Sequence, residues 1–352
     1  PRRATWTRPV GCWAGGSSPW ATVAAVFEEA VGFASLRAAA HRAARGKRLS
    51  SHAAAFMAEV EREALALERE LLAGTYRPGP YRTFQVREPK ARTISAASFR
   101  DRVVHHAVCH ALEPRFEELA LPWSFACRRG RGTRAALEHA RDLCRRCPYV
   151  LKLDVRHFFE TLDHAVLERL LRPVCPDPQM LELLRVIVRH GAPGSPPGKG
   201  APIGNLTSQH FANHYLRPLD QLISRDVRPM GWCRYMDDIL VFGRDKPFLW
   251  QAAQRVATFA AERLRLELRA EVTRVFPVLD GVPFLGFRIF PGVVRLDRRG
   301  RARLFRKLRA VSTEVDDGAL SQEDGARVVH GLLGWARLAD SRTLLRSLYG
   351  TV

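Results

Sequence analysis

Three aspartates of this chain have the spacing to hold divalent cations. Two are adjacent in the stretch Arg234-Tyr235-Met236-Asp237-Asp238, between apolar segments 231–233 and 239–242 that read as strands, so we expect them at the turn of a β-hairpin. Two carboxylates about 4 Å apart repel by roughly 4 kcal/mol at an effective dielectric near 20, unless a cation lies between them. Mg²⁺ favours such oxygen ligands and completes its shell with water and phosphates. An isolated Asp-Asp pair is more often a solvated turn, so the metal-binding interpretation needs a third carboxylate.

A third aspartate occurs earlier in the chain in a matching setting. Segment 149–155 is an apolar, β-branched strand that carries Asp154 near its end, and a helix is expected over 164–171. A strand-end aspartate combined with an Asp-Asp hairpin can hold two metals for phosphoryl transfer. One metal activates the attacking hydroxyl and the other neutralises the leaving pyrophosphate.

These two stretches resemble the palm motifs of reverse transcriptases, in which Tyr-Met-Asp-Asp is the hallmark box. The resemblance implies an RNA-directed DNA polymerase of α+β class, with a right-hand fold of fingers, an antiparallel palm sheet and a short helical thumb. It implies that Asp154, Asp237 and the backbone of Val155 hold two Mg²⁺, with Mn²⁺ as a possible substitute, and that Asp238 supports the pair. We therefore predict that the three aspartates are catalytic and, with Val155, metal-binding. The implied partners are template RNA, the RNA/DNA hybrid and deoxynucleoside triphosphates.

The charge of the chain indicates a polyanionic partner. The 352 residues include 56 Lys and Arg against 36 Asp and Glu, which gives a formal net charge of +20. No apolar run approaches the roughly 18 residues of a membrane-spanning helix, and no signal-peptide pattern opens the chain, so we expect no membrane partner. Seven scattered cysteines indicate reduced thiols. We expect a cytoplasmic protein encoded by a bacterium or phage.

The expected domains follow the order of the motifs. Residues 1–34, with Trp6, Trp13 and Trp20, are expected to form an arm. Residues 35–148 are expected to form N-terminal helices and fingers, 149–290 the palm and 291–352 the thumb, with 164–205 supplying helices and a loop between fingers and palm. Periodicity and caps predict helices over 19–45, from Ser50 or Ser51 to Gly74, and over 103–112, 133–144, 210–223 and 245–268. Hairpins are predicted over 84–95 and 281–290.

Several residues are expected to bind the incoming nucleotide. The hairpin over 84–95 resembles the fingers hairpin that closes over the nucleotide, and Lys90 and Arg92 match the residues that hold its triphosphate. Fixed positive charge is needed where a leaving pyrophosphate builds up negative charge. Phe159, the fifth residue after Asp154, matches the aromatic gate that excludes a 2′-hydroxyl, although it could also be a core aromatic. Tyr235 of the hallmark box is placed in the same set.

The stretch Ile203-Gly204-Asn205-Leu206-Thr207-Ser208-Gln209 narrows the resemblance. Most reverse transcriptases have glutamine before this glycine and Ser-Pro at the end. The pattern here resembles the enzymes of diversity-generating retroelements, which copy a template repeat with frequent errors at adenines. Replacing an amide beside the nascent pair by an aliphatic chain removes a geometric check. We assign Ile203, Gly204 and Gln209 to nucleotide binding.

The resemblance to the enzymes of diversity-generating retroelements also implies a small basic accessory protein that forms a ring. On a chain this basic, its docking site is expected at an acidic or apolar patch around 61–70.

One family landmark is missing. The family motif Asn-Pro-x-Lys-Thr aligns with residues 269–273, and the lysine that would protonate pyrophosphate is replaced by Val272. Either Arg269 or Arg274 supplies the charge, or water donates the proton.

Basic residues are also expected along the path of the nucleic acid. Residues 288–309 contain nine basic side chains and one acid, and each neutralised phosphate adds about −0.7 to −0.9 to the salt slope of binding. The residues predicted to contact nucleic acid are Arg100, Arg102, Arg128, Arg131, Arg298, Arg299, Arg301, Arg303, Arg306 and Lys307.

Two alternatives remain open. One keeps the fold and makes the chain a defence-associated or retron-like reverse transcriptase, although retron enzymes more often have Ala than Met before the two aspartates. The other is an RNA-binding module with an inactive palm, against which stands the presence of all three aspartates.

Overall fold

The computed structural model describes residues 25–46, 50–86 and 91–341. Lys90, the tip of the predicted fingers hairpin and the three tryptophans of the predicted arm lie outside these ranges. Within the described residues, the helix predicted over 19–45 is present as two helices, α1 (Ala25–Val31) and α2 (Phe33–Ala44), the first of which lies in the part assigned to the arm. Phe27 and Val31 are buried in the main core, which explains why this part of the expected arm folds onto the body.

A layer of helices forms the N-terminal part. α3 (Ser51–Ala58) and α4 (Val60–Leu72) replace the one helix expected up to Gly74, and α4 buries Ala64, Leu67 and Leu71 at helical spacing. α5 spans Phe99–Leu119 and is longer than predicted. It begins at Ser98, whose hydroxyl accepts from the Asp101 N–H, and it continues past Pro114 because Phe116 is still buried against the core.

The predicted hairpin before this helix is confirmed. β1 (Arg82–Val86) pairs antiparallel with β2 (Arg92–Ala96), with Phe84 opposite Ile94. The Ser95 N–H donates to the Ile203 carbonyl over 2.9 Å. The hairpin is thereby tied to the stretch that carries the predicted nucleotide-binding residues.

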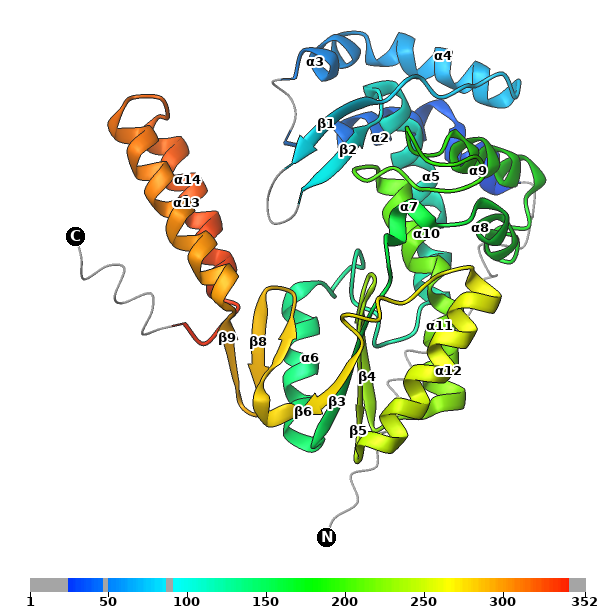
Figure 1. The fold of residues 1–352 in the computed structure, drawn as a ribbon. Coiled ribbons are helices and arrows are strands. Elements are labelled where there is room, and N and C mark those ends of the chain that lie inside the picture. Colours follow the sequence, from blue (N-terminus) through cyan, green and yellow to red (C-terminus); the bar gives the residue numbers. More distant parts are fainter. Residues whose placement is uncertain (1–24, 47–49, 87–90, 342–352) are drawn as a thin grey trace, which may run out of the picture.

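A four-stranded antiparallel sheet occupies the centre of the molecule, in the order β4-β5-β3-β6 (Figure 1). The strands are β3 (Tyr149–Asp154), β4 (Gly231–Tyr235), β5 (Asp238–Gly243) and β6 (Arg274–Pro277). Both faces are covered, because alternate residues of a strand point to opposite sides. Leu151 and Ile239 join the main core, whereas Val150 and Leu240 join a second cluster with α6 (Thr133–Arg146).

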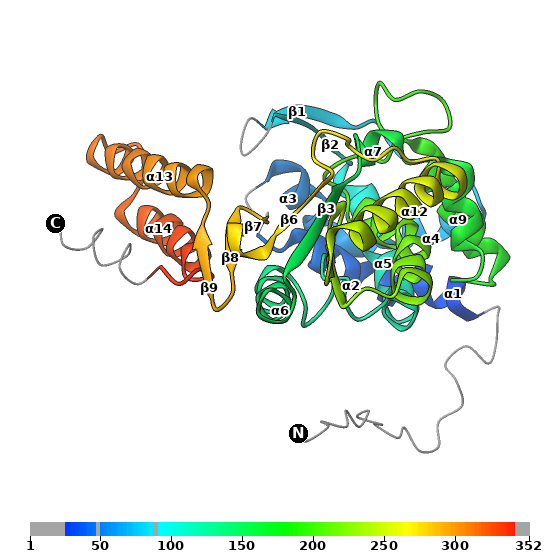
Figure 2. The same ribbon diagram turned by 60° about the horizontal axis from the view of Figure 1, so that its bottom comes forward.

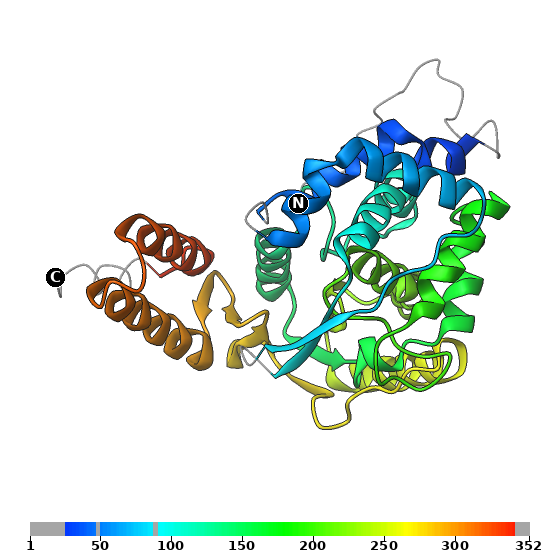
Figure 3. The ribbon, with the colours of Figure 1, turned by 90° about the horizontal axis from the view of Figure 1, so that it is seen from above.

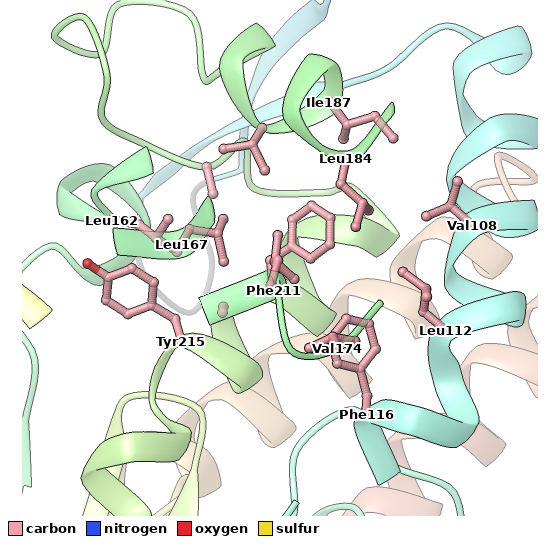
Figure 4. Packing of buried hydrophobic residues seen from close by; sticks show 14 of the residues in the cluster. Val108, Leu112, Phe116, Leu162, Leu167, Val174, Leu184, Ile187, Phe211 and Tyr215 are labelled. Atoms are coloured by element: carbon pink, nitrogen blue, oxygen red, sulfur yellow. The ribbon is translucent and has the colours of Figure 1, made fainter. Parts of the chain in front are cut away.

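Helices pack on the main-core side of this sheet. They are α7 (Phe158–Thr161), α8 (His164–Leu171), α9 (Pro178–His190), α10 (Leu206–Tyr215), α11 (Arg217–Gln221), the π-helical turn η1 (Leu222–Val227) and α12 (Lys246–Leu264). Figure 4 shows where α5, α9 and α10 meet: Leu112, Leu184 and Phe211 point toward one another.

The helix predicted over 210–223 starts earlier, at Leu206. It is divided at Leu216 into α10 and α11, and Pro218 lies in the first turn of α11. The helix predicted to reach 268 ends at Leu264, since Arg265 adopts a left-handed conformation with φ of 53°.

The C-terminal part is a small sheet followed by a helical hairpin. After η2 (Val278–Asp280), strands β7 (Val282–Phe284), β8 (Phe287–Phe290) and β9 (Val293–Leu296) form an antiparallel sheet. β9 pairs with β8, so this sheet continues past residue 290, where the palm was expected to end. α13 (Arg298–Asp316) packs on α14 (Gln322–Ala336), and Figures 1 and 2 show this pair standing apart from the N-terminal helices. Figure 3 shows it from above, on the opposite side from α8 and α9.

Within the described residues, no helix combines the length and the apolar character that crossing a membrane requires.

Candidate functional site

Antiparallel pairing brings the predicted aspartates to one end of the central sheet. Asp154 closes β3 and lies opposite Asp238, the first residue of β5. Asp237 occupies the turn between β4 and β5, where Met236 has a φ of 54°. A non-glycine residue at positive φ is uncommon and indicates a turn held by its surroundings.

A buried arginine provides that support. The guanidinium of Arg234 is 1% exposed and donates to the Met236 carbonyl over 3.1 Å. It also forms an ion pair with Asp220 at 2.6 Å, and it donates to Ser124 and Asn213. Arg234 thus connects the turn that carries Asp237 to the segments of Ser124, Asn213 and Asp220. No sequence pattern predicted a role for Arg234.

Asp154 and Asp237 line one pocket of about 350 Å³. Burial, and then the negative charge of Asp154, raise the pKa of Asp237 to about 6, while the positive charge of Arg92 opposes the rise. A buried carboxylate whose proton affinity is raised by a neighbouring carboxylate is a position where a divalent cation is stabilising. The donor set fits Mg²⁺ or Mn²⁺, which bind through one or two carboxylates and leave positions for phosphate oxygens.

Asp238 is not among the residues that line this pocket. Its two carboxylate oxygens accept hydrogen bonds from Lys152 Nζ over 2.8 and 3.1 Å, and Lys152 Nζ also donates to the Pro283 carbonyl over 2.8 Å. Among the residues that the structure describes, no three His, Cys, Asp or Glu side chains are arranged to hold a metal. The structure therefore brings together two of the three predicted metal-binding carboxylates and pairs the third with a lysine.

The sequence contained a signal for this lysine. Lys152 and Asp154 are two residues apart in a strand, so they share a face. Since Asp154 lies opposite Asp238, Lys152 is the diagonal neighbour of Asp238, within reach of a long side chain. Predicting the contact between Lys152 and Asp238 requires the register of β3 against β5, which the local sequence pattern does not give.

Three of the seven residues predicted to bind the nucleotide line the same pocket: Arg92, Phe159 and Ile203. Gly204, Gln209 and Tyr235 do not line it, and Lys90 lies outside the described residues. Gly204 has a φ of 116°, and a Cβ there would lie 2.8 Å from Ile94, so the close approach to the hairpin requires glycine. Gln209 accepts a hydrogen bond from the Cys127 thiol, and the Tyr235 hydroxyl accepts one from Thr133.

Arg269 lines the pocket and lies three residues before Val272, which stands where the family has lysine. Its guanidinium lies 3.5 Å from Asp154 Oδ1, and its backbone N–H donates to the Asp154 carbonyl over 2.9 Å. The alternative, Arg274, instead lies over the ring of Phe276 at 5.1 Å. Of the two candidates for the charge of the absent lysine, Arg269 is the one that reaches the pocket.

The predicted nucleic-acid contacts fall into different environments. The side chain of Arg128 is only 9% exposed, pairs with Glu117, and donates over 2.7 Å to the carbonyls of Leu121 and Ser124. These contacts brace the loop before α6 and leave little of this side chain exposed for the predicted contact with nucleic acid. Arg100 pairs with Glu70 and lies over Tyr76. Arg131 is exposed and lies 5.7 Å from the Phe125 ring.

Arg102 and Arg82 line a second pocket of about 320 Å³, beside the exposed ring of Phe84. Burial and the positive charge of Arg82 lower the pKa of Arg102.

The predicted basic stripe lies on α13. Gly300, Leu304 and Val311 form its buried face, so the basic residues project from the other faces. Arg303 is half-buried and lies 4.9 Å from the Trp335 ring. The exposed members are Arg298, Arg299, Arg301, Arg306 and Lys307.

Comparison with known proteins identifies the family of the chain. The reverse transcriptase (RNA-dependent DNA polymerase) family matches residues 85–289, which include β2, both aspartate strands and the residues that line the pocket. The chain is 25% identical to protein YkfC of Escherichia coli K12 over 290 residues, covering 70% of this chain and 74% of that protein.

Two further similarities extend over smaller shares of the relatives. The chain is 25% identical to the group II intron-encoded protein LtrA of Lactococcus lactis subsp. cremoris over 162 residues, covering 44% of this chain but 27% of LtrA. An apo telomerase from Candida tropicalis resembles it with a TM-score of 0.50 and 10% identity, over 66% of this chain and 52% of that one. This likeness concerns the fold, and it agrees with the predicted α+β, right-hand polymerase architecture. The chain belongs to the reverse transcriptase family.

Proposed function

We propose that this reverse transcriptase copies an RNA template into cDNA by nucleotidyl transfer in the pocket between Asp154 and Asp237. The observation that carries the proposal is that Asp154, Asp237, Arg92, Arg269 and the ring of Phe159 all line one pocket. Carboxylates suit divalent cations, arginines suit a triphosphate, and a ring can stack beneath a sugar.

The residues divide the work in this proposal. Asp154, Asp237 and the Val155 carbonyl hold two Mg²⁺, which supply charge neutralisation at the attacking hydroxyl and at the leaving pyrophosphate. Arg92 and Lys90 bind the triphosphate, and Arg269 adds positive charge beside Asp154. Phe159 stacks beneath the deoxyribose and excludes a 2′-hydroxyl. Ile203 lies beside the nascent base pair.

We further propose that copying is error-prone, as in a diversity-generating retroelement. The support is the aliphatic side chain of Ile203, which lines the pocket with Phe159 and offers no hydrogen bond to the nucleotide. A site without such a hydrogen bond discriminates poorly between base pairs of similar shape. Template RNA is then the main partner, and the small ring-forming accessory protein docks on the acidic residues of α4, among them Glu61 and Glu63.

Sequencing of cDNA tests the error-prone function. Wild-type enzyme, Mg²⁺, four deoxynucleotides and a defined RNA template should give errors concentrated opposite template adenines. Ile203→Gln restores an amide at the pocket wall and should lower those errors about tenfold, whereas Ile203→Leu keeps the aliphatic surface and should leave them unchanged. Equal error rates opposite all four bases in the wild type would refute the error-prone proposal and leave the polymerase.

The similarity to LtrA favours one alternative. LtrA is encoded by a group II intron, and the alternative function is that of a reverse transcriptase that copies its RNA faithfully, as the defence-associated or retron-like alternative requires. Faithful copying in the same assay would support this alternative.

A further inference from the structure

Lys152 occupies a position between three structural parts. Its side chain is 12% exposed and projects from β3 on the face that carries Asp154. Its ammonium nitrogen contacts both oxygens of Asp238, on β5, and the carbonyl of Pro283, on β7. An ammonium has three N–H donors, and these three acceptors satisfy all of them.

The pairing controls which carboxylates can reach a cation. Asp238 lies opposite Asp154 and next to Asp237, so three negative charges occur within one strand end and one turn. Asp238 is 20% exposed at its side chain, and Lys152 neutralises it locally. A paired carboxylate that has both oxygens engaged by an ammonium is a poor ligand for a hard cation, because binding would require breaking a charge-assisted bond.

The hydrogen bond from Lys152 to the Pro283 carbonyl joins β3 to the small sheet of β7, β8 and β9. Pro283 lies opposite Arg288 in the β7–β8 pair, and β9 of the same sheet leads into α13. The Lys152–Pro283 hydrogen bond therefore connects the catalytic turn to the sheet from which the basic helix extends. Proline has no N–H, but its carbonyl remains a full acceptor.

We infer that Lys152 is a positioning residue that withholds Asp238 from the metal site and fixes the β7–β8 hairpin against the catalytic turn. Asp154 and Asp237 are then the two carboxylates that hold the cations, and Asp238 acts through Lys152. The kinetic part of this inference rests on the proposed polymerase function, while its metal-binding part does not.

Metal binding without substrate gives the decisive test. Mn²⁺ titration of the full chain, followed by electron paramagnetic resonance, reports cation affinity independently of catalysis. An Asp154→Asn/Asp237→Asn variant identifies the signal from the site. Lys152→Met keeps the length of the side chain and removes its charge, so it should free Asp238 and tighten Mn²⁺ binding at least threefold. The double variant Lys152→Met/Asp238→Asn should return the affinity to within twofold of wild type.

A second variant keeps the inference testable if Lys152→Met does not fold. Asp238→Asn should change Mn²⁺ affinity by less than threefold, because Asp238 is not a ligand here. A tenfold or greater weakening would make Asp238 a metal ligand and overturn the inference. Mn²⁺ affinity within twofold of wild type in folded Lys152→Met would overturn it as well.

Polymerase kinetics test the hydrogen bond between Lys152 and the Pro283 carbonyl. Lys152→Met should lower kcat at least tenfold and leave KM for the deoxynucleotide within threefold, since the triphosphate contacts are untouched. Lys246→Met is a matched control: Lys246 lies over the ring of Tyr149, at the other end of β3, and should leave both constants within twofold. A rise in KM that matches the fall in kcat/KM would contradict a positioning role. If no variant polymerises but Mn²⁺ binding shifts as expected, the inference stands and the proposed reaction fails.

Discussion

Arg269 holds Asp154 by both backbone and side chain. Its N–H donates to the Asp154 carbonyl over 2.9 Å, and its guanidinium lies 3.5 Å from Asp154 Oδ1. The segment around it runs beside the end of β3, where Leu268 forms a bridge with Val155. The positively charged guanidinium of Arg269 is therefore held in place, three residues before Val272, the residue that replaces the family lysine.

Removing this guanidinium should slow catalysis. A single fixed donor at developing charge contributes about 10²–10³ in rate, so Arg269→Ala should lower kcat by about 100-fold. Arg269→Lys keeps the charge and should recover part of the loss. Arg274→Ala is the matched control, because Arg274 lies over Phe276 and outside the pocket. An Arg274→Ala loss as large as that of Arg269→Ala would show that Arg269 has no special role.

The buried Arg234–Asp220 pair should dominate local stability. Both side chains are 2% exposed or less, and burial raises the pKa of Asp220 while the charge of Arg234 lowers it. Arg234→Met leaves an uncompensated buried carboxylate and should cost about 3–5 kcal/mol in the free energy of unfolding, measured in urea at pH 7. Arg234→Met/Asp220→Asn should recover at least half. Arg145→Met removes an exposed ion pair with Asp142 and should cost about 1 kcal/mol or less; equal costs for the two single variants would contradict the assignment.

Stability should fall as the solution becomes acidic, in part through two buried histidines. Burial lowers the pKa of His105 and of His214 to about 4, below the value near 6.5 in an unfolded chain. The unfolded state then binds more protons below pH 6.5, so this stability is complete above that pH and is lost progressively down to pH 4. Each histidine accounts for about 2 kcal/mol between pH 7 and pH 5.

Urea unfolding of His214→Gln at pH 7 and pH 5 measures the contribution of His214 to this loss of stability. The variant should lose about 2 kcal/mol less than wild type between pH 7 and pH 5. His110→Gln, at an exposed position of the same helix as His105, should keep the wild-type difference. An unchanged pH dependence in His214→Gln would disprove the contribution of His214.

Phe159 should control the choice of sugar. It lines the pocket and packs at 5.5 Å against Phe158, which is buried in the core. Phe159→Val opens space for a 2′-hydroxyl and should reduce the preference for deoxynucleotides over ribonucleotides, measured as a ratio of kcat/KM, by about 10–200-fold. Phe159→Tyr retains the ring and should preserve the preference. An unaltered ratio in Phe159→Val would leave Phe159 as a core aromatic.

The sequence predicted the features that depend on local patterns. Apolar and β-branched runs around 149–155 and 239–242 gave the correct strands, and the turn position of Asp237 followed from them. Asp163 and Asp245, which accept N–H donors at the starts of α8 and α12, show why those helix starts were predictable.

Features that depend on distant partners were not predictable in the same way. The burial of Arg128 comes from Glu117 and from two carbonyls, and the pairing of Asp238 comes from Lys152, 86 residues away. α5 outlasts its expected end because its last turns pack on other helices, as the contacts of Phe116 with His210 and His214 show. In each case tertiary contacts override local preference.

Primer extension on an RNA template tests the central claim most directly. Asp237→Asn removes the charge of a pocket carboxylate with almost no change in shape, and Asp226→Asn removes a charge from an exposed aspartate of η1. With Mg²⁺ and four deoxynucleotides, wild type and Asp226→Asn should extend the primer at equal rates, and Asp237→Asn should be at least 10³-fold slower while still binding the hybrid. Extension by Asp237→Asn at the wild-type rate would contradict a polymerase site between Asp154 and Asp237.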